Sequence, residues 1–359
     1  MYFYNVDFLG FILLPFSLLY GLVIVLRNKL FDWKILPSER FSLPVICVGN
    51  LSAGGTGKTP HVEYLIRLLD KQCTIATLSR GYGRKTRGFV FADPDSTATS
   101  IGDEPMQYVN KFSAITVAVH EKRREGIRML LQKKPETNLV LLDDAMQHRY
   151  VTPGLTILLT DYRHLYVNDY LLPSGRLREP IKGASRADII IVTKTPKIFS
   201  PITRRSISEK LSPKPWQNLF FSYIRYGELV PFHSTEIQPM QKKYGTIVLF
   251  AGIANCYPLQ EYLKNLCEEL ITLQFSDHHC YSPKEMEQIK VCYHEVFSKS
   301  KIIVTTEKDA MRLKNTSLEE IIVNLPVFYL PIEVAFHKED KEIFEEKVKD
   351  YVRKDQHHL

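Results

Sequence analysis

A glycine-rich turn between an apolar run and a helical stretch constrains this chain more than any other feature. Residues 45–59 read VICVGNLSAGGTGKT. In such a turn the backbone N–H groups, aimed by the following helix N-terminus, cradle phosphate, while the lysine reaches the outer phosphates and the threonine hydroxyl ligates Mg²⁺. Glycine is needed because the backbone must approach oxygen atoms closely and adopt positive φ. The residues predicted to bind nucleotide phosphate are Asn50, Ser52, Ala53, Gly54, Gly55, Thr56, Gly57, Lys58 and Thr59.

Departures from the strict pattern separate the nucleotide-binding classes. Ser52 stands where the template Gly-x-x-x-x-Gly-Lys-Thr has its first glycine, and Gly54 and Gly55 supply the missing backbone freedom. Partition and targeting ATPases with a deviant loop carry a lysine where this chain has Ala53. A GTPase would show an Asn/Thr-Lys-x-Asp string, and the string at 193–196 lacks the aspartate. A membrane-tethered NTPase that acts as a switch or assembly factor remains the alternative to an enzyme of small molecules.

Short β-branched runs alternate with longer amphipathic stretches between residues 45 and 192, which is typical of βαβ units around a parallel sheet. The expected buried strands are Val45–Val48, Thr74–Leu78, Ile115–Val119, Leu139–Leu142, Thr156–Leu159 and Ile189–Val192. His61–Leu69 and Glu121–Gln132 have apolar residues at helical spacing, and Asp93–Gly102 is expected as a turn-rich loop. The predicted fold class is therefore α/β, with a P-loop NTPase-like parallel-sheet domain.

A second, smaller α/β block is expected after residue 246. Its predicted elements are a strand at Ile247–Gly252, helices at Pro258–Cys267 and Pro283–Phe297, and strands at Ile302–Thr305 and Val327–Leu330. Five prolines and poor periodicity between residues 197 and 243 predict a linker, and residues 338–354 are expected to form a charged helix with a solvated face. The predicted organisation is an apolar helix at 1–40, a P-loop domain at 41–200, a linker at 201–245 and a domain at 246–359 that closes over the site.

The N-terminal run Phe8–Leu26 contains 19 residues and no charge. Crossing a bilayer as a helix takes about 20 residues. The first seven residues contain no basic residue and no small-x-small cleavage site follows, which argues against a cleaved signal peptide. Arg27, Lys29 and Lys34 follow the run, so the positive-inside bias places the rest of the chain in the cytoplasm. A proline and glycines interrupt the run, which leaves a kinked helix in one leaflet and a buried core helix as alternatives.

Two adjacent carboxylates follow a buried run. Asp143 and Asp144 come directly after Leu139–Leu142, and Gln147 lies three positions beyond them. A P-loop protein needs a carboxylate near Mg²⁺ at the end of a buried strand, so we expect a Mg²⁺-linked role for at least one of the two. Gln147 could join the same set through its carbonyl oxygen, whereas an N-cap of the next helix is the structural alternative.

Two further clusters are less specific. Asp103 and Glu104 precede a proline at the end of the turn-rich loop, where they fit a turn as well as a site. Residues 276–281 read SDHHCY, and adjacent ligand types argue against zinc, which favours a catalytic or interdomain histidine.

Composition narrows the class. Lys plus Arg exceed Asp plus Glu by 47 − 40 = 7, and the excess is dispersed, which suits an anionic substrate or membrane surface without marking a nucleic-acid site. The six cysteines are scattered without a Cys-x-x-Cys pair, which favours a reducing compartment. No feature indicates an obligate protein partner.

Together these motifs resemble the tetraacyldisaccharide 4'-kinases (lipid A 4'-kinases), a membrane-associated P-loop family. The matching strings follow the family's order and span most of the chain: the apolar N-terminus, Gly49–Pro60, Ser79–Arg84, Gly102–Pro105, Asp143–His148, Leu172–Pro180, Asp277-His278 and Thr306–Ala310. The resemblance implies transfer of the γ-phosphoryl group of ATP to the 4'-hydroxyl of a tetraacylated glucosamine disaccharide 1-phosphate. It also implies Mg²⁺ as cofactor and a location on the cytoplasmic face of the inner membrane, attached through the N-terminal helix.

The resemblance also implies residue roles. Asp103 would accept the hydroxyl proton, with His278 beside it from the second block and Lys58 on the phosphates. The implied metal ligands are Thr59, Glu104 and Gln147, with Asp143 or Asp144 nearby. The arginines implied to contact the acceptor are Arg80, Arg84, Arg123 and Arg178.

Overall fold

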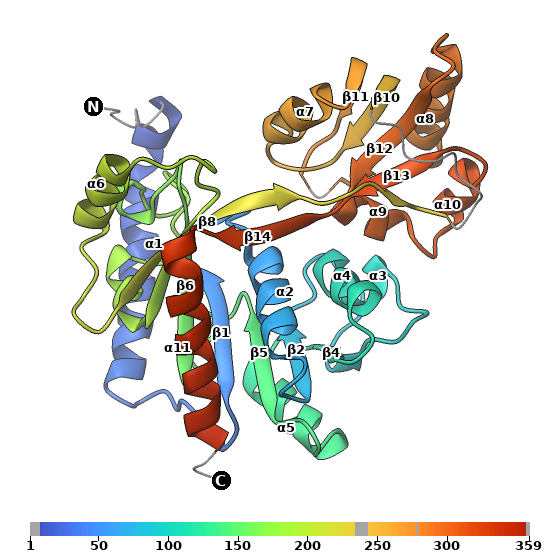
Figure 1. Cartoon of the computed structure of the whole chain (residues 1–359). Coiled ribbons are helices and arrows are strands. Elements are labelled where there is room, and N and C mark those ends of the chain that lie inside the picture. The colour runs from blue at the N-terminus through green and yellow to red at the C-terminus, as the bar shows by residue number, and fades with distance from the viewer. Residues whose placement is uncertain (1–7, 234–242, 278, 357–359) are drawn as a thin grey trace.

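The computed structural model describes residues 8–233, 243–277 and 279–356. Figure 1 shows two α/β lobes, each built around one β-sheet. The large lobe has a nine-stranded sheet of order β14-β8-β7-β6-β1-β5-β2-β4-β3, and the small lobe has a five-stranded sheet of order β11-β10-β12-β13-β9. The strands of the large sheet are β1 (Val45–Asn50), β2 (Ile75–Ser79), β3 (Val90–Phe91), β4 (Thr116–Val119), β5 (Leu139–Asp143), β6 (Leu155–Asp161), β7 (Ile189–Thr193), β8 (Asn218–Tyr226) and β14 (Ile332–Phe336).

The centre of the large sheet is parallel, as predicted. β1 pairs in parallel with β5 on one side and β6 on the other, and this register sets Val48 opposite Asp143. These strands are continuous apolar runs because helices cover both faces of a parallel sheet. All six strands expected between residues 45 and 192 are present, which confirms the α/β class.

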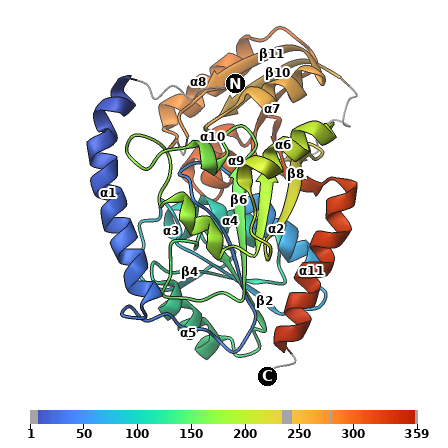
Figure 2. The ribbon, with the colours of Figure 1, turned by 90° about the vertical axis from the view of Figure 1, so that its left-hand side faces the viewer.

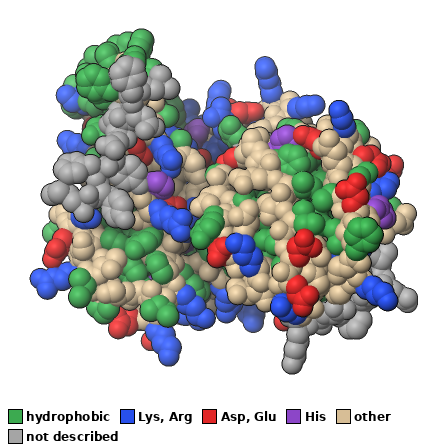
Figure 3. Space-filling view, turned by 90° about the horizontal axis from the view of Figure 1, so that it is seen from above, with side chains coloured by type: hydrophobic (Ala, Val, Ile, Leu, Met, Phe, Trp, Pro, Cys, Tyr) green, Lys and Arg blue, Asp and Glu red, His purple; other side chains and the backbone are tan. Residues whose placement is uncertain are grey.

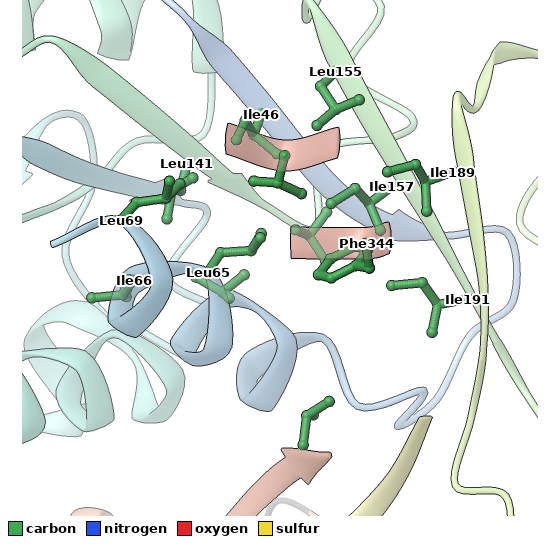
Figure 4. Packing of buried hydrophobic residues seen from close by; sticks show 14 of the residues in the cluster. Ile46, Leu65, Ile66, Leu69, Leu141, Leu155, Ile157, Ile189, Ile191 and Phe344 are labelled. Carbon is green, nitrogen blue, oxygen red and sulfur yellow. The ribbon is translucent and has the colours of Figure 1, made fainter. Parts of the chain in front are cut away.

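Helices cover both faces of this sheet. α2 and α11 pack on one face, where Leu65, Ile66 and Phe344 contact Ile46 and Ile157 (Figure 4). α5 lies on the opposite face with the side chains of β1, β2 and β5 that point away from α2. The helices of the large lobe are α1 (Phe8–Asp32), α2 (Lys58–Leu69), α3 (Ala98–Ile101), α4 (Asp103–Lys111), α5 (Arg123–Lys133), α6 (Pro201–Leu211) and α11 (Lys338–Gln356), with 3-10 turns at Tyr166–Asn168 and Ile181–Arg186.

The small lobe contains two strands that the sequence pattern did not reveal, β9 (Val230–Pro231) and β11 (Cys267–Gln274). The helix expected to run to Cys267 ends at Lys264, and Cys267 instead begins a strand that pairs in parallel with β10. This strand is at the edge of its sheet and half exposed, so polar residues interrupt its apolar pattern. The elements of the small lobe are β9 (Val230–Pro231), β10 (Tyr244–Ala251), α7 (Tyr257–Lys264), β11 (Cys267–Gln274), α8 (Pro283–Glu295), β12 (Lys301–Thr306), α9 (Glu307–Leu313), α10 (Ser317–Ile322) and β13 (Val327–Leu330).

Two strands connect the lobes. Where the sequence predicted a linker at 201–245, the structure has α6 and β8, and β8 joins the large sheet beside β7. The chain enters the small lobe after β8 and returns through β14, which pairs antiparallel with β8 (Figure 1). Pro201 stands at the first turn of α6, where proline is tolerated, so proline content misleads here. How the chain divides into independently folding domains stays a prediction.

The C-terminal helix α11 returns to the large lobe and is not solvated on all sides. Phe344, Val348 and Val352 are 1%, 0% and 4% exposed, and they form one apolar stripe against the large sheet. The rest of the helix is charged, as expected. In the sequence, the spacing of four residues between these apolar side chains indicates that one side of the helix is buried.

An ionic and apolar contact joins α4 of the large lobe to α9 of the small lobe. The Lys111 ammonium lies 2.7 Å from both the Glu63 and the Glu307 carboxylates. Beside it, Ile101 and Met106 pack on Ala310 and Met311 of α9. Burial, with a further contribution from Glu63, raises the pKa of Glu307 from 4.5 to about 7, although Lys111 opposes the shift.

Helix α1 runs along the outside of the large lobe with its apolar residues pointing outward. It is the one helix among the described residues long and apolar enough to cross a membrane. Figure 2 shows it along one edge of the lobe, opposite α11, and Figure 3 shows hydrophobic side chains on the projection where it reaches the top of the molecule. Its exposed large apolar residues include Phe11, Ile12, Phe16, Leu18, Leu19, Leu22, Val23 and Leu26.

The buried stripe of α11 predicts a stability effect. Phe344→Ala should lower the free energy of unfolding by about 3–5 kcal/mol, because it removes an aromatic side chain and leaves a cavity under the sheet. Urea unfolding followed by circular dichroism measures this. Phe297→Ala, at a fully exposed phenylalanine, should change it by less than about 0.5 kcal/mol. Equal effects of the two substitutions would contradict the packing of α11.

The Glu307 cluster predicts a pH dependence of stability. Because the pKa of Glu307 is raised to about 7 in the folded protein, its protonation stabilises the fold fully below pH 4.5, and this contribution is lost as pH rises through 7. Glu307→Gln should therefore lose less stability than wild type between pH 5 and 8, by on the order of 2 kcal/mol. Chemical denaturation at several pH values tests this, with the exposed Glu320→Gln as the control. Parallel pH profiles for wild type and Glu307→Gln would rule the effect out.

Candidate active site

The glycine-rich turn connects the end of β1 to the start of α2, as the sequence predicts. Gly54 and Gly57 have φ angles of +106° and +86°, a conformation that favours glycine. A Cβ atom added to Gly54 or Gly55 would meet nothing within 4 Å, so the backbone on this side of the loop is open to a close ligand. Lys58 is the first residue of α2, and its side chain is 11% exposed. The loop therefore offers backbone N–H groups and one ammonium to an anion.

The carboxamide of Asn50 organises the loop from beneath. It is completely buried, and its Nδ2 donates to Thr56 Oγ1 at 2.9 Å. Its Oδ1 accepts from Lys58 Nζ at 3.4 Å and from the Arg178 guanidinium. The backbone carbonyl oxygen of Asn50 accepts from Gln147 Nε2 at 2.8 Å. Asn50 thus fixes Lys58 and the loop relative to the end of β1.

The adjacent carboxylates Asp143 and Asp144 have different environments. Asp143 is fully buried, and its Oδ2 accepts from the Tyr108 hydroxyl at 2.8 Å. Burial, together with the charge of Glu104, raises the pKa of Asp143 to about 7. Asp144 has φ of +49° and turns toward Lys58, at 3.7 Å, and Arg178, whose guanidinium donates to both carboxylate oxygens at 2.9 and 2.7 Å. Burial would raise its pKa, but Lys58 and Arg178 lower it to about 2.

The residues predicted to hold Mg²⁺ offer oxygen atoms that suit this cation. Asp143 Oδ1 is buried and has no hydrogen-bond partner among the described residues. Thr59 follows Lys58 on α2, Gln147 reaches the end of β1 through its amide, and the Glu104 charge acts on Asp143. In the described part of the chain no three His, Cys, Asp or Glu side chains form a metal cage. Mg²⁺ in phosphate-transfer sites needs only one or two carboxylates beside waters and the phosphates, so the set is sufficient.

Asp103 stands at the N-terminus of α4 and is held by the small lobe. Its side chain is 7% exposed, and its Oδ2 accepts from the Arg312 guanidinium at 2.8 Å. Lys308 Nζ lies 3.6 Å from the same oxygen and 3.8 Å from Glu104 Oε1. Arg312 also binds Asp309 at 2.6 Å. Lys308 and Arg312 thus lie against Asp103. The sequence alone assigned them no role, although Lys308 lies within the string Thr306–Ala310 that matches the family.

His278 lies outside the described residues, so its position relative to Asp103 stays a prediction. The neighbouring residue His279 lies beside Gly252, and Gly252 in turn lies beside Asp309 and Arg312, the arginine that binds Asp103. A Cβ atom on Gly252 would lie 3.0 Å from Asp309 and 3.1 Å from His279. Arg312 Nη1 also donates to the Gly252 carbonyl oxygen at 3.1 Å. The neighbouring His279 lies 3.0 Å from Glu285.

The end of β7 supports the loop from its other side, which sequence reasoning did not foresee. Thr193 Oγ1 donates to the Thr56 carbonyl oxygen at 2.9 Å. Lys194 Nζ donates to the Gly55 carbonyl oxygen and pairs with Asp161 at 2.9 Å. Residues 193 and 194, which belong to the string that lacks the aspartate of a GTPase, therefore support the backbone of the phosphate loop.

The four predicted acceptor-binding arginines lie in different environments. Arg80 is exposed and makes no hydrogen bond or ion pair with any residue that the structure describes. Arg84 binds Glu121 at 2.6 Å, and Arg178 is committed to Asn50 and Asp144. Arg123 is 1% exposed and donates to the His120 carbonyl oxygen at 2.7 Å. Burial lowers its pKa to about 10, and this geometry gives no support to its predicted contact with the acceptor.

Comparisons with known proteins identify relatives of the whole chain. A family model described as Tetraacyldisaccharide-1-P 4'-kinase matches residues 9–353. A Bacteroides thetaiotaomicron protein named Tetraacyldisaccharide 4'-kinase is 47% identical over 352 residues, covering 95% of this chain and 93% of that protein. A Flavobacterium johnsoniae protein of the same name is 47% identical over 325 residues, covering 90% of this chain and 92% of that protein.

A solved structure shares the whole fold. The crystal structure of Aquifex aeolicus LpxK, described as an "apo" form in complex with ATP, has a TM-score of 0.73 and 29% sequence identity. The match covers 96% of this chain and 99% of that one. With the family model matched over residues 9–353, this chain belongs to the tetraacyldisaccharide-1-P 4'-kinase family.

Proposed function

We propose that this protein is an ATP-dependent kinase that phosphorylates the 4'-hydroxyl of a tetraacylated glucosamine disaccharide 1-phosphate, a step in lipid A biosynthesis. Membership of the family over residues 9–353 supports an enzyme rather than a membrane-tethered NTPase switch. The single observation that carries the proposal is the placement of Lys58 and two carboxylates around one open glycine loop. Lys58 lies 3.7 Å from Asp144, and Asp143 lies opposite Val48 on the neighbouring strand.

The two carboxylates divide the work at the ATP site. Both oxygens of Asp144 already accept from Arg178, so Asp144 positions Lys58. Asp143 retains one buried oxygen, Oδ1, without a partner among the described side chains, so Asp143 is the better metal ligand. Thr59, Glu104 and Gln147 would complete the protein's part of the Mg²⁺ site. When bound, the cation neutralises charge on the β- and γ-phosphates.

Asp103 is proposed to accept the proton of the acceptor hydroxyl. In phosphoryl transfer through a loose transition state the protein mostly positions groups, and the proton moves late. Arg312 and Lys308 hold the Asp103 carboxylate from the small lobe, which ties its position to the contact between α4 and α9. His278 is proposed to act with Asp103 from the loop next to Gly252. Arg80 is exposed and suits the acceptor's 1-phosphate.

Helix α1 is proposed to lie in the membrane surface rather than across the bilayer. Leu18 and Leu22 are 74% and 65% exposed, whereas Ser17 is 5% exposed against the large lobe. A lone spanning helix would present every side to lipid, but one side of α1 contacts a folded lobe between Ser17 and Asn28. The exposed Lys29, which follows the apolar run, favours the anionic cytoplasmic leaflet.

Label transfer tests the reaction. Wild type incubated in detergent with γ-labelled ATP, Mg²⁺ and the tetraacylated disaccharide 1-phosphate should place label in the glycolipid. Lys58→Ala should abolish transfer with the fold intact, because the loop loses its ammonium. Lys71→Ala, at an exposed lysine after α2, is the matched control and should behave as wild type. Near-normal transfer by Lys58→Ala would refute the assignment of the loop.

A double-mutant cycle tests the proton acceptor. Asp103→Ala and His278→Ala should each lower kcat by roughly 10²–10⁴-fold, as expected for general base catalysis. The double variant should be scarcely worse than either single variant, because groups that act as a unit are strongly non-additive. Asp95→Ala, on the exposed loop before α3, serves as the control. Multiplicative losses would show that the two residues act independently.

A further inference from the structure

A segment that sequence reasoning left without a structural role lies along the outer side of the phosphate loop. We call residues 171–179 the strap. Ala53 N donates to the Arg176 carbonyl oxygen at 2.6 Å, and Arg178 N donates to the Leu51 carbonyl oxygen at 2.7 Å. Ser52 and Leu177 form an antiparallel bridge between these two bonds. The first residues of the loop are therefore one side of a short ladder, and the strap is the other.

The same strap delivers Arg178 to the site. Its guanidinium binds both Asp144 oxygens and Asn50 Oδ1, and these two residues in turn hold Lys58. A shift of the strap would therefore move the loop backbone and the neighbours of Lys58 together.

Helix α1 holds the strap from its opposite side. Ser17 Oγ donates to the Leu171 carbonyl oxygen at 3.0 Å and accepts from Ser174 N at 3.0 Å. One turn later, the Tyr20 hydroxyl donates to the Arg178 carbonyl oxygen at 2.8 Å. Gly21 permits this close approach, because a Cβ atom there would lie 2.7 Å from a Leu171 methyl group. Hydroxyl-bearing residues inside an otherwise apolar helix are thus used to dock it on the strap.

A second path runs from α1 to the same point of the loop. Arg27 Nη2 donates to the Gln147 carbonyl oxygen at 3.0 Å. The Gln147 amide donates to the Asn50 carbonyl oxygen at 2.8 Å and to Glu179 at 2.9 Å. Both paths therefore end on Asn50, the residue beneath Lys58.

The other side of α1 is apolar and exposed, so it takes no part in these contacts. The helix thus separates two tasks between its sides: large apolar side chains point outward, and Ser17, Tyr20 and Arg27 contact the strap and Gln147. A helix that only anchored the protein would not need hydrogen bonds to the segment that carries Arg178.

We propose that Ser17 and Tyr20 are positioning residues of the ATP site, which act through the strap on Arg178 and residues 50–53. This inference rests on the proposed function, since it assigns ATP to that loop. Both side chains bond to the strap and not to the phosphate loop, so their loss should change the affinity of the site and not the phosphoryl-transfer step. A single hydrogen bond is worth roughly two- to tenfold in an equilibrium constant.

The test uses the full-length chain in detergent micelles. The double variant Ser17→Ala/Tyr20→Phe should raise KM for ATP about three- to thirtyfold, with kcat at saturating ATP within twofold of wild type. ATP binding measured by titration calorimetry should weaken by the same factor. Both substitutions keep the helix apolar, so vesicle binding should be unchanged. An unchanged KM for ATP, or a loss of kcat in step with the loss of folded protein, would overturn the proposal.

Two matched variants separate the strap contacts from general effects. Tyr170→Phe removes an exposed hydroxyl just before the strap and should leave both constants unchanged. Leu22→Ala, on the exposed side of α1, should weaken vesicle binding without changing KM for ATP in micelles. An equal rise in KM from Leu22→Ala would attribute the effect to lipid contact and contradict the proposal. If wild type itself bound no ATP, the proposed function would fail. If wild type labels the glycolipid and the double variant has the same KM for ATP as wild type, only the inference about Ser17 and Tyr20 fails.

Discussion

The buried carboxamide of Asn50 is the interaction on which the rest of the site depends. One side chain at the end of β1 donates to Thr56 in the loop and accepts from Lys58 on α2 and Arg178 on the strap. A buried polar group left without partners costs about 1–3 kcal/mol, so these elements can part only if several bonds break together. The phosphate loop is therefore fixed in its open shape by groups beneath it, which spares the nucleotide the cost of ordering it.

Two neighbouring carboxylates at one strand end present an electrostatic problem that the fold solves by giving each a different environment. The positive φ of Asp144 turns that residue toward two cations, which lowers its pKa to about 2. Asp143 remains in the strand, fully buried with the Tyr108 hydroxyl on one of its oxygens, and burial raises its pKa to about 7. One carboxylate is thus held in its charged form by Lys58 and Arg178, and the other keeps one buried oxygen without a partner among the described residues. Opposite displacement of two adjacent acids is a common mark of divided roles in active sites.

The sequence predicts the strands and loops whose residue types follow from their own local conformation and burial. Apolar runs predict β1, β5 and β6, and the Gly-Lys-Thr string predicts the loop, because burial on both faces and positive φ each demand particular residue types. The strand β8 was missed because prolines on either side of it suggested a linker, although none lies within it. Partnerships across long separations left no local sign: Arg312 and Asp103 are 209 positions apart. The resemblance supplied a role for Asp103, but only the three-dimensional arrangement pairs it with Arg312.

The outward-facing apolar side of α1 has a kinetic consequence. An enzyme seated by such a helix keeps its phosphate loop at a constant height above the lipid and meets a lipid acceptor by lateral diffusion in two dimensions. Its rate then follows the number of acceptor molecules per unit of membrane area rather than their bulk concentration. Diluting the acceptor with inert lipid would slow turnover even when the total amounts of enzyme and acceptor stay constant.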